Sequence, residues 1–297
     1  MMKQIVIDPA IPQWKGNFHC HTTVSDGRLS PDQVAALYAR AGYDFLAITD
    51  HRKVVDPRSV KADLLLIPGV ELDYVVQRRH RQAVHIVGVG VGLDLMNTPG
   101  LMDEPQRGID GINASGGRAI FAHPAWSLND SAMIEGLRGL SAVEIYNHMS
   151  DEPWNGRRGD SSEVLDLCCA DGMCLPFVAG DDAHHYDGDE CHSALIACAE
   201  ELTAQAVADA LGKGNVYATQ GPRIREMFIE DGVVTVRCTP AEQILFNSNR
   251  FYSPERVIRG HGITEARYHL RDIETFLRLE ITDRDGKRAW SSPVRLG

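Results

Sequence analysis

The sequence predicts an α/β protein, with a barrel over most of the chain and a small all-β module at its carboxyl end. Short apolar runs alternate with stretches of helical periodicity, which favours parallel strands connected by helices. About six or seven such units favour a closed barrel over an open sheet. From about residue 222 onward, strand signals continue without any helical unit between them.

The predicted strands are short apolar runs, and the continuous ones are typical of strands covered on both faces. A first strand over residues 3–7 leads into a connecting arm over residues 9–15. The barrel strands are then expected over residues 18–21, 45–48, 64–68, 84–89, 118–122, 142–146, 175–179, 193–197 and 216–218.

The clearest helix signal begins at Ser30. Ser30 supplies a capping hydroxyl, Pro31 fits the first helical position, and Asp32 places an acid in the first turn. Gly42 ends this helix. Further helices are expected over residues 104–114, 162–170 and 203–211.

The carboxyl-terminal segment shows strand and turn signals without a helical unit. Asp231 and Gly232 predict a tight hairpin turn, further strands are expected over residues 243–246 and 276–282, and a second Asp-Gly turn lies at 285–286. The predicted organisation is an arm over residues 1–15, a barrel over 16–221 and a β module over 222–297.

Composition limits the classes of partner. The 297-residue chain has a net charge of −11, which argues against an extended nucleic-acid surface but leaves room for a small anionic substrate at a metal cluster. Its seven cysteines form no Cys-x-x-Cys pair, as expected of reduced thiols in a cytoplasmic protein. We find no signal peptide and no apolar segment long enough to span a membrane.

The most informative stretch is the run from residue 17 to residue 27. His19 and His21 alternate on a predicted strand and therefore point to the same side, and Asp26 follows in a Ser-Asp-Gly turn. Neutral imidazole is a common ligand of zinc, manganese and iron. Two strand histidines are also explained as structural groups, so this stretch needs matching ligands elsewhere.

Further ligand types follow the later strands, at the barrel end where such folds carry their chemistry. Unpaired, these side chains would be costly to bury, but together they suit two or three divalent cations such as Zn, Mn or Fe. The candidate set is His19, His21, Asp26, His51, Glu71, His85, His123, Asp182 and His184. A structural metal site or a catalytically inactive relic is the alternative interpretation.

The order of these motifs resembles the PHP (polymerase and histidinol phosphatase) superfamily over residues 16–219. The motifs are His-x-His, Ser-Asp-Gly, Thr-Asp-His, Pro-Gly-Val-Glu, His-Ile-Val-Gly, Ala-His-Pro and Asp-Ala-His. The resemblance implies a distorted (β/α)7 TIM-like barrel with a trinuclear metal centre that hydrolyses phosphoesters.

The resemblance also implies a role for each candidate. It assigns His19, His21, Glu71 and Asp182 to one metal, Glu71, His85 and His123 to a second, and Asp26, His51 and His184 to a third. A metal-bridging hydroxide held by Glu71, Asp182 and His184 would be the nucleophile. The last motif reads Gly-Asp-Asp-Ala-His. We align Asp182 as the ligand and leave the role of Asp181 open.

The tail is similar to that of a PHP branch related to the carbaryl hydrolase CehA. The similarity rests on Gly-Pro at 221–222 and on a closing Asp-Gly-x-x-x-Ala-Trp-Ser-x-Pro. It places an amide, carbamate or ester substrate beside a phosphomonoester, nucleotide or oligonucleotide. A third hypothesis is a non-catalytic binding module that metals only stabilise.

Substrate contacts are predicted on weaker grounds. Cationic side chains suit an anionic, phosphate-bearing substrate, although each is also explained as a solvated surface residue. Asn147 and His148 follow a strand end, where Asn147 also fits turn chemistry. The full set is Arg52, Lys53, Asn147, His148, Arg118, Arg157 and Arg158.

Other conspicuous side chains receive a structural interpretation. Cys20 lies between two ligands on the strand and is expected in the core. The histidines without a motif are expected at the surface or in structural roles, with the one next to His184 as the foremost exception. They are His80, His185, His192, His261 and His269.

Overall fold

The computed structural model describes residues 3–78 and 81–296, so His80 lies outside the described residues. The strands are β1 (Gln4–Ile7), β2 (Gln13–Asn17), β3 (Phe45–Ile48), β4 (Leu65–Gln77), β5 (Arg81–Val89), β6 (Arg118–Phe121), β7 (Leu140–Asn147), β8 (Phe177–Gly180), β9 (Ala194–Cys198), β10 (Val216–Thr219), β11 (Ile224–Glu230), β12 (Val233–Asn247), β13 (Val257–His269), β14 (Phe276–Thr282), β15 (Arg288–Ser291) and β16 (Val294–Arg295). The α-helices are α1 (Pro31–Arg40), α2 (Pro105–Ala114), α3 (Ser131–Glu135), α4 (His148–Asp151), α5 (Ser162–Ala170) and α6 (Ala204–Lys213). The 3-10 helices are η1 (Pro57–Ser59), η2 (Leu95–Asn97), η3 (Pro153–Asn155) and η4 (Pro254–Arg256).

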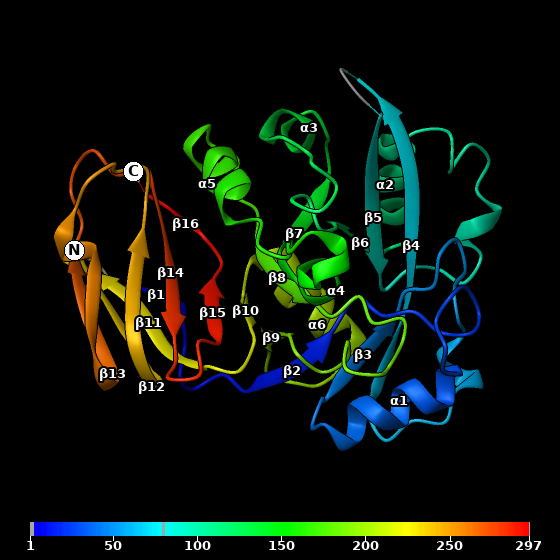
Figure 1. Ribbon diagram of the computed structural model, residues 1–297, viewed down its shortest axis with the longest axis horizontal. Helices are drawn as coiled ribbons and strands as arrows, with labels where there is room; N and C mark the ends of the chain where they lie inside the picture. Colours follow the sequence, from blue (N-terminus) through cyan, green and yellow to red (C-terminus); the bar gives the residue numbers. More distant parts are fainter. Residues whose placement is uncertain (1–2, 79–80, 297) are drawn as a thin grey trace.

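These elements form a mixed α/β fold around one large sheet (Figure 1). Strands β2, β3 and β4 are parallel, and so are β6, β7 and β8. The residues that follow β2 and β8 then meet. The Asp182 N–H donates to the His19 carbonyl at 2.8 Å, and the His21 N–H donates to the Ala183 carbonyl at 2.9 Å. The strand ends that carry the predicted ligands therefore lie together.

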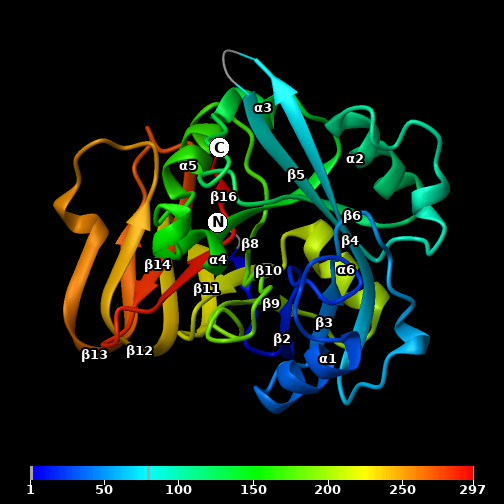
Figure 2. The ribbon, with the colours of Figure 1, turned by 45° about the vertical axis from the view of Figure 1, so that its right-hand side comes forward.

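The predicted all-parallel alternation is wrong in two places. β4 and β5 pair antiparallel, because only three residues of sequence separate them and parallel pairing needs a long crossover. β9 runs antiparallel to both β2 and β10. The hairpin projects well beyond its neighbours (Figure 2). Because both of its strands are long, Glu71 and His85 lie inside strands rather than at strand ends.

The first barrel strand begins earlier than predicted. β2 spans Gln13–Asn17, which moves it into the predicted arm, and the segment from His19 to His21 follows it. The apolar signal is missing because Gly16 lies against Phe45: a Cβ there would come within 2.0 Å of the ring. Close packing therefore requires glycine at this position, and a glycine gives no apolar strand signal in the sequence.

The predicted helix after Ser30 is confirmed. The Ser30 hydroxyl accepts from the Gln33 N–H at 3.4 Å, and the Gln33 side chain accepts from the Ser30 N–H at 2.9 Å, which together make a capping box. α1 buries Val34 and Tyr38, and no helix of the described ranges is long and apolar enough to cross a membrane.

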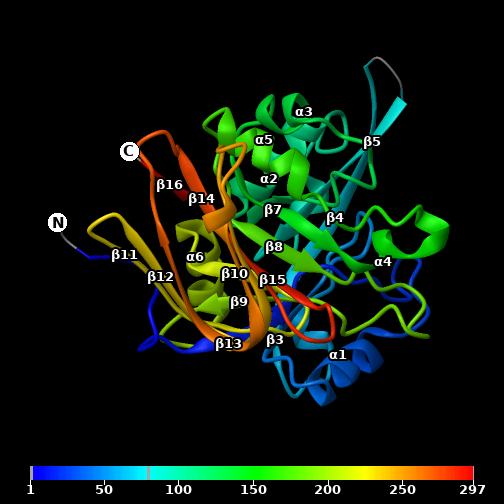
Figure 3. The same cartoon turned by 60° about the vertical axis from the view of Figure 1, so that its left-hand side comes forward.

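From Ile224 to Arg295 the described elements are strands and the single turn η4. β11 and β12 pair across the predicted turn, where Asp231 and Gly232 have φ of 50° and 73°. Strand β13 was not predicted, because its sequence is rich in glycine and charged residues that face solvent. These strands join the rest through two pairs, β10 with β15 and β1 with β11 (Figure 3). The predicted division at residue 222 stays a prediction.

Two ion pairs also connect the carboxyl-terminal strands to the segment between β7 and β8. Arg278 is 2% exposed and contacts Asp166 through two hydrogen bonds of 2.6 and 2.8 Å. Arg288 pairs with Asp160. Burial alone raises the pKa of Asp160, but Arg288 and hydrogen bonds from Ser162 outweigh it and lower that pKa below the usual value.

We predict that Asp166→Ala lowers the free energy of unfolding by about 3 kcal/mol, because it leaves the buried Arg278 guanidinium with only its longer contact to Glu280 at 3.4 Å. Urea denaturation followed by circular dichroism measures the change. The matched control is Arg267→Ala, which removes an exposed guanidinium paired with Glu265 and leaves the unfolding midpoint unchanged. Equal midpoints for wild type and Asp166→Ala would contradict the prediction.

We also predict a pH-dependent effect of Asp160→Asn. Since the folded protein holds the pKa of Asp160 below its unfolded value, the carboxylate stabilises the fold above about pH 4 and loses this effect as pH falls through the folded pKa. The stability difference between wild type and Asp160→Asn is therefore largest near neutral pH and shrinks in acid. A difference that grows on acidification would refute this assignment.

Candidate metal centre

All nine predicted ligands come together in the structure. They form three groups, and within each group the ligand atoms lie within 4.8 Å of one another. The groups are His19, His21, Glu71 and Asp182; Glu71, His85 and His123; and His21, Asp26, His51 and His184. The third group also includes His21, which the family resemblance assigned only to the first group.

The first group is fully enclosed. His19 Nε2 lies 3.3 Å from Glu71 Oε2 and 3.2 Å from Asp182 Oδ1. His21 Nε2 lies 3.1 Å from each of the same two oxygens. The His19 and His21 side chains are 0% exposed, so bulk solvent does not reach these two rings.

Glu71 belongs to more than one group. Its Oε1 lies 2.8 Å from His85 Nδ1 and 3.3 Å from His123 Nε2, while its Oε2 faces the first group. Oε2 also lies 3.3 Å from His51 Nδ1 in the third group. One buried carboxylate therefore contacts all three groups of imidazoles.

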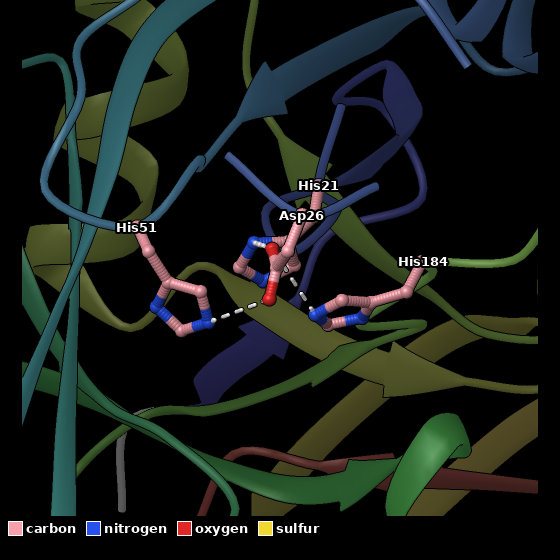
Figure 4. A group of neighbouring side chains, drawn as sticks. All are labelled: His21, Asp26, His51 and His184. Carbon is pink, nitrogen blue, oxygen red and sulfur yellow. Dashed lines mark ion pairs between the residues drawn. The ribbon is translucent and has the colours of Figure 1, made fainter. Parts of the chain in front are cut away.

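The third group is more open and is centred on Asp26 (Figure 4). Oxygens of Asp26 lie 3.6 Å from His21 Nδ1, 3.7 Å from His184 Nε2 and 3.8 Å from His51 Nε2. The Asp26 side chain is 54% exposed. These spacings leave room for an ion between the carboxylate and the three rings.

The charges of this cluster support one another. Burial alone would raise the pKa of Glu71, but the positive charges of His19 and His85 outweigh it and hold that pKa well below its usual range. Burial lowers the pKa of His21, but Asp182 and Glu71 overcome this and raise it to about 9. Carboxylates that attract protons to these rings attract metal cations equally well.

A direct test of fit is whether buried polar atoms lack partners. Five such atoms in the cluster have no hydrogen-bond partner among the described residues: His19 Nε2, both ring nitrogens of His21, His51 Nδ1 and Asp182 Oδ1. Each unsatisfied atom costs free energy, and a divalent cation would satisfy several at once. The nitrogen and oxygen donors suit zinc, manganese or iron.

Glu144 supports the cluster, and sequence reasoning missed it. Its carboxylate lies 2.8 Å from His19 Nδ1 and accepts from the His123 N–H at 2.9 Å and from the Asn147 amide at 3.0 Å. Because Glu144 accepts a hydrogen bond from the Nδ1–H of His19, the ring takes the tautomer that presents its Nε2 to the cluster. The available signal was a carboxylate between Val143 and Ile145 inside a buried strand.

Two further aspartates hold the backbone that presents the ligands. Asp50 accepts from the Thr22 N–H at 2.7 Å and the Ser25 hydroxyl at 2.7 Å, and so fixes the turn that carries Asp26. Asp181, whose role the sequence left open, accepts from the hydroxyl of Tyr38 at 2.7 Å and from three backbone N–H groups of residues 191–193. Asp181 is thus a structural anchor, and Asp182 faces the cluster.

Gly180 is required where β8 passes the cluster. A Cβ at this position would come within 2.4 Å of Glu144 Oε1 and 2.7 Å of the His19 Cβ. Only a residue without a side chain lets Glu144 approach His19 so closely.

The cluster opens into a pocket of about 290 Å³. The pocket wall consists of ligands together with aromatic and small polar side chains of the β6–α5 region. Its lining residues are His51, Glu71, His85, His123, Trp126, Met149, Ser150, Trp154, Asn155, Asp182, His184 and His185. His185, the foremost exception among the histidines without a motif, does line the pocket.

Several predicted substrate contacts lie elsewhere. Asn147 is 0% exposed and caps α4, while its amide contacts Glu144, so it positions structure rather than substrate. Arg118 begins β6, at the strand end away from the cluster, and pairs with Asp209 of α6 at 3.7 Å. Neither side chain lines the pocket, and their contact with a substrate stays a prediction.

The remaining predicted contacts are outside the pocket wall. Arg52 forms a two-pronged ion pair with Asp73, at 2.9 and 2.8 Å, and Lys53 is exposed. His148 stacks on His192, with ring centroids 3.9 Å apart. Burial and the neighbouring His192 lower the pKa of His148 to about 4.

Arg157 and Arg158 are exposed in the loop after η3. Cys20, predicted in the core, is fully buried and its Sγ donates to the Ala47 carbonyl at 3.5 Å. His261 is exposed beside Glu242. His269 is exposed on β13.

Comparison with known proteins supports the fold. No protein-family model matches the sequence, and no curated protein matches it. Among solved structures, a two-domain protein from Bacteroides vulgatus that contains a predicted PHP-like metal-dependent phosphoesterase superimposes with a TM-score of 0.53. The match has 16% identity and covers 98% of this chain and 96% of the other. The fold is PHP-like.

Two more solved structures resemble part of this chain. An amidohydrolase from Chromobacterium violaceum, with bound sulfate and no metal, has a TM-score of 0.46 and 18% identity. A protein from Bifidobacterium adolescentis described as a metal-dependent phosphoesterase has a TM-score of 0.42 and 16% identity. Each match covers 59% of this chain and 89% of the other.

We predict that Glu144→Ala lowers metal affinity by about 10- to 100-fold, because His19 loses the acceptor that fixes its tautomer. Titration of the metal-free protein with zinc or manganese, followed by calorimetry, measures the change. Glu152→Ala is the control, since that residue is outside the cluster and contacts His148. Unchanged affinity in Glu144→Ala would show that the tautomer needs no such support.

Proposed function

We propose that the protein is a metal-dependent hydrolase, and specifically a phosphoesterase that cleaves a small phosphomonoester, nucleotide or oligonucleotide phosphoester. The observation that carries this proposal is the position of Glu71, one buried carboxylate within 3.3 Å of imidazoles from all three ligand groups. Sharing such a carboxylate would keep neighbouring cations only a few ångströms apart. Two-metal sites with about 3.5–4 Å between the ions occur in phosphatases, polymerases and nucleases, and also in aminopeptidases.

The number and openness of the ligands favour catalysis over a structural role. A structural zinc site is complete with four ligands, whereas nine converge here and border a pocket. Divalent cations held there would supply a water nucleophile at neutral pH and offset charge on the phosphoryl oxygens. His19, His21 and Asp182 would hold one cation, and Glu144 would keep His19 in the required tautomer.

The finer features of the proposal follow from the same arrangement. We interpret residues 16–221 as a distorted (β/α)7 barrel and residues 222–297 as a separate β module. Two or three ions of zinc, manganese or iron would occupy the cluster. The substrate would be small, because the pocket measures about 290 Å³.

A second candidate is an amide, carbamate or ester hydrolase. It is favoured by the pocket lining, which includes no lysine or arginine of the described residues, while Trp126, Met149 and Trp154 supply apolar surface. A neutral substrate needs no cationic clamp. The same metal cluster would serve this reaction, so substrate profiling separates the two candidates.

We predict that His21→Ala removes at least one metal ion and nearly all turnover, because this ring contributes to two of the three groups. Elemental analysis measures the metals. Hydrolysis of p-nitrophenyl phosphate, a nucleotide panel and 1-naphthyl carbamate measures activity. The control is His261→Ala, which changes an exposed histidine outside the cluster.

The outcomes discriminate among the hypotheses. Turnover of phosphoesters alone supports the main proposal, and turnover of the carbamate alone supports the second candidate. Full metal content without turnover of any substrate would favour a non-catalytic binding module. Retention of both metal and activity in His21→Ala would overturn the assigned centre.

A further inference from the structure

The pocket has an aromatic wall that the metal ligands do not use. Beyond the cluster it is bordered by Trp126, Met149 and Trp154. Trp154 is 68% exposed, although indole is among the most costly side chains to leave in water. Single exposed apolar residues are common on proteins, so the placement of this one must carry the argument.

The backbone beneath Trp154 is held from both sides. Trp154 lies in η3, the 3-10 turn Pro153–Asn155, which begins with a proline of fixed φ and ends at Gly156 with a φ of 78°. The Asn155 amide donates to the Met149 carbonyl at 2.9 Å. The indole is thus exposed on a fixed turn, which reduces the entropy that a ligand would have to remove on binding.

Trp126 connects this turn to the metal cluster. Its indole N–H donates to Asn155 Oδ1 at 3.1 Å. Its ring packs edge-on against His123, with centroids 5.0 Å apart, and against His85 at 5.9 Å. Trp126 therefore has partners on both sides, whereas Trp154 presents its surface to the pocket. The aromatic wall and the imidazoles form one continuous surface.

The same loop continues with two cations. Arg157 and Arg158 are exposed, but neither side chain lines the pocket. The aromatic surface, and not these guanidinium groups, therefore carries the inference.

We propose that Trp154 is the stacking platform for a planar aromatic ring in the substrate, whose scissile bond lies at the metal cluster. This inference rests on the proposed hydrolase function and adds the substrate class. The ring can be an aryl group or a nucleobase, since both offer a planar face. Stacking of this kind contributes on the order of tenfold or more to affinity.

The test compares substrates that differ only in the ring. Benzyl phosphate and cyclohexylmethyl phosphate are both esters of primary alcohols and are similar in size, but only the first has a planar ring. AMP and ribose 5-phosphate form a second pair. We expect Trp154→Ala to lower kcat/KM about tenfold or more for benzyl phosphate, AMP or both, with little change for their ringless partners.

The two pairs identify the source of the ring. A loss confined to AMP indicates a nucleobase, and a loss confined to benzyl phosphate indicates a smaller aryl group. Trp154→Phe retains a planar ring and should keep most of the preference. The matched control is Phe251→Ala, which removes an aromatic ring that is fully exposed and lies outside the pocket wall.

A binding measurement separates this proposal from the proposed function. Benzylphosphonate and cyclohexylmethylphosphonate contain no ester bond, so calorimetry measures their affinity without turnover. If no phosphoester is cleaved but benzylphosphonate binds more tightly to wild type than to Trp154→Ala, the phosphoesterase proposal fails and the platform stands. Equal losses for ringed and ringless ligands, or no loss in Trp154→Ala, would overturn the platform.

Discussion

The structure depends on one buried carboxylate among imidazoles. Glu71 is 1% exposed, and such a charge is tolerated only because His19, His21, His51, His85 and His123 surround it. These rings come from strands β2, β3, β5 and β6 or the residues that follow them, so the strands must pair in the correct register for the cluster to form. Formation of the fold therefore depends on the same balance of charges that builds the site.

Three buried carboxylates accept hydrogen bonds that hold the ligands of the cluster in place. Glu144 aligns His19 and the backbone of His123, while Asp50 fixes the turn that carries Asp26. Asp181 tightens the loop beyond β8. Neighbouring aspartates thus have opposite duties, because backbone hydrogen bonds saturate the oxygens of Asp181 whereas one oxygen of Asp182 has no protein hydrogen-bond donor among the described residues.

The ligands could be predicted from sequence because their chemistry restricts residue type and spacing, as in His19 and His21. Glu144 gave only a weak signal, a carboxylate inside a buried strand, since its partners His19 and His123 lie far from it in the sequence. The hairpin of β4 and β5 was misjudged because the apolar run at residues 64–68 ends before the strand does. The position of Arg118 away from the cluster could have been predicted. Arg118 begins its strand, and parallel barrels carry their chemistry at the carboxyl ends of the strands.

The pairing of β1 with β11 links distant parts of the chain. Gln4 lies beside Ile229, and only a few residues separate β1 from β2 of the metal-binding part. During synthesis from the ribosome, β1 emerges before β11, so its edge lacks this partner while the residues between the two strands are translated. Such long-range pairing slows folding and exposes an unfinished sheet edge until β11 arrives.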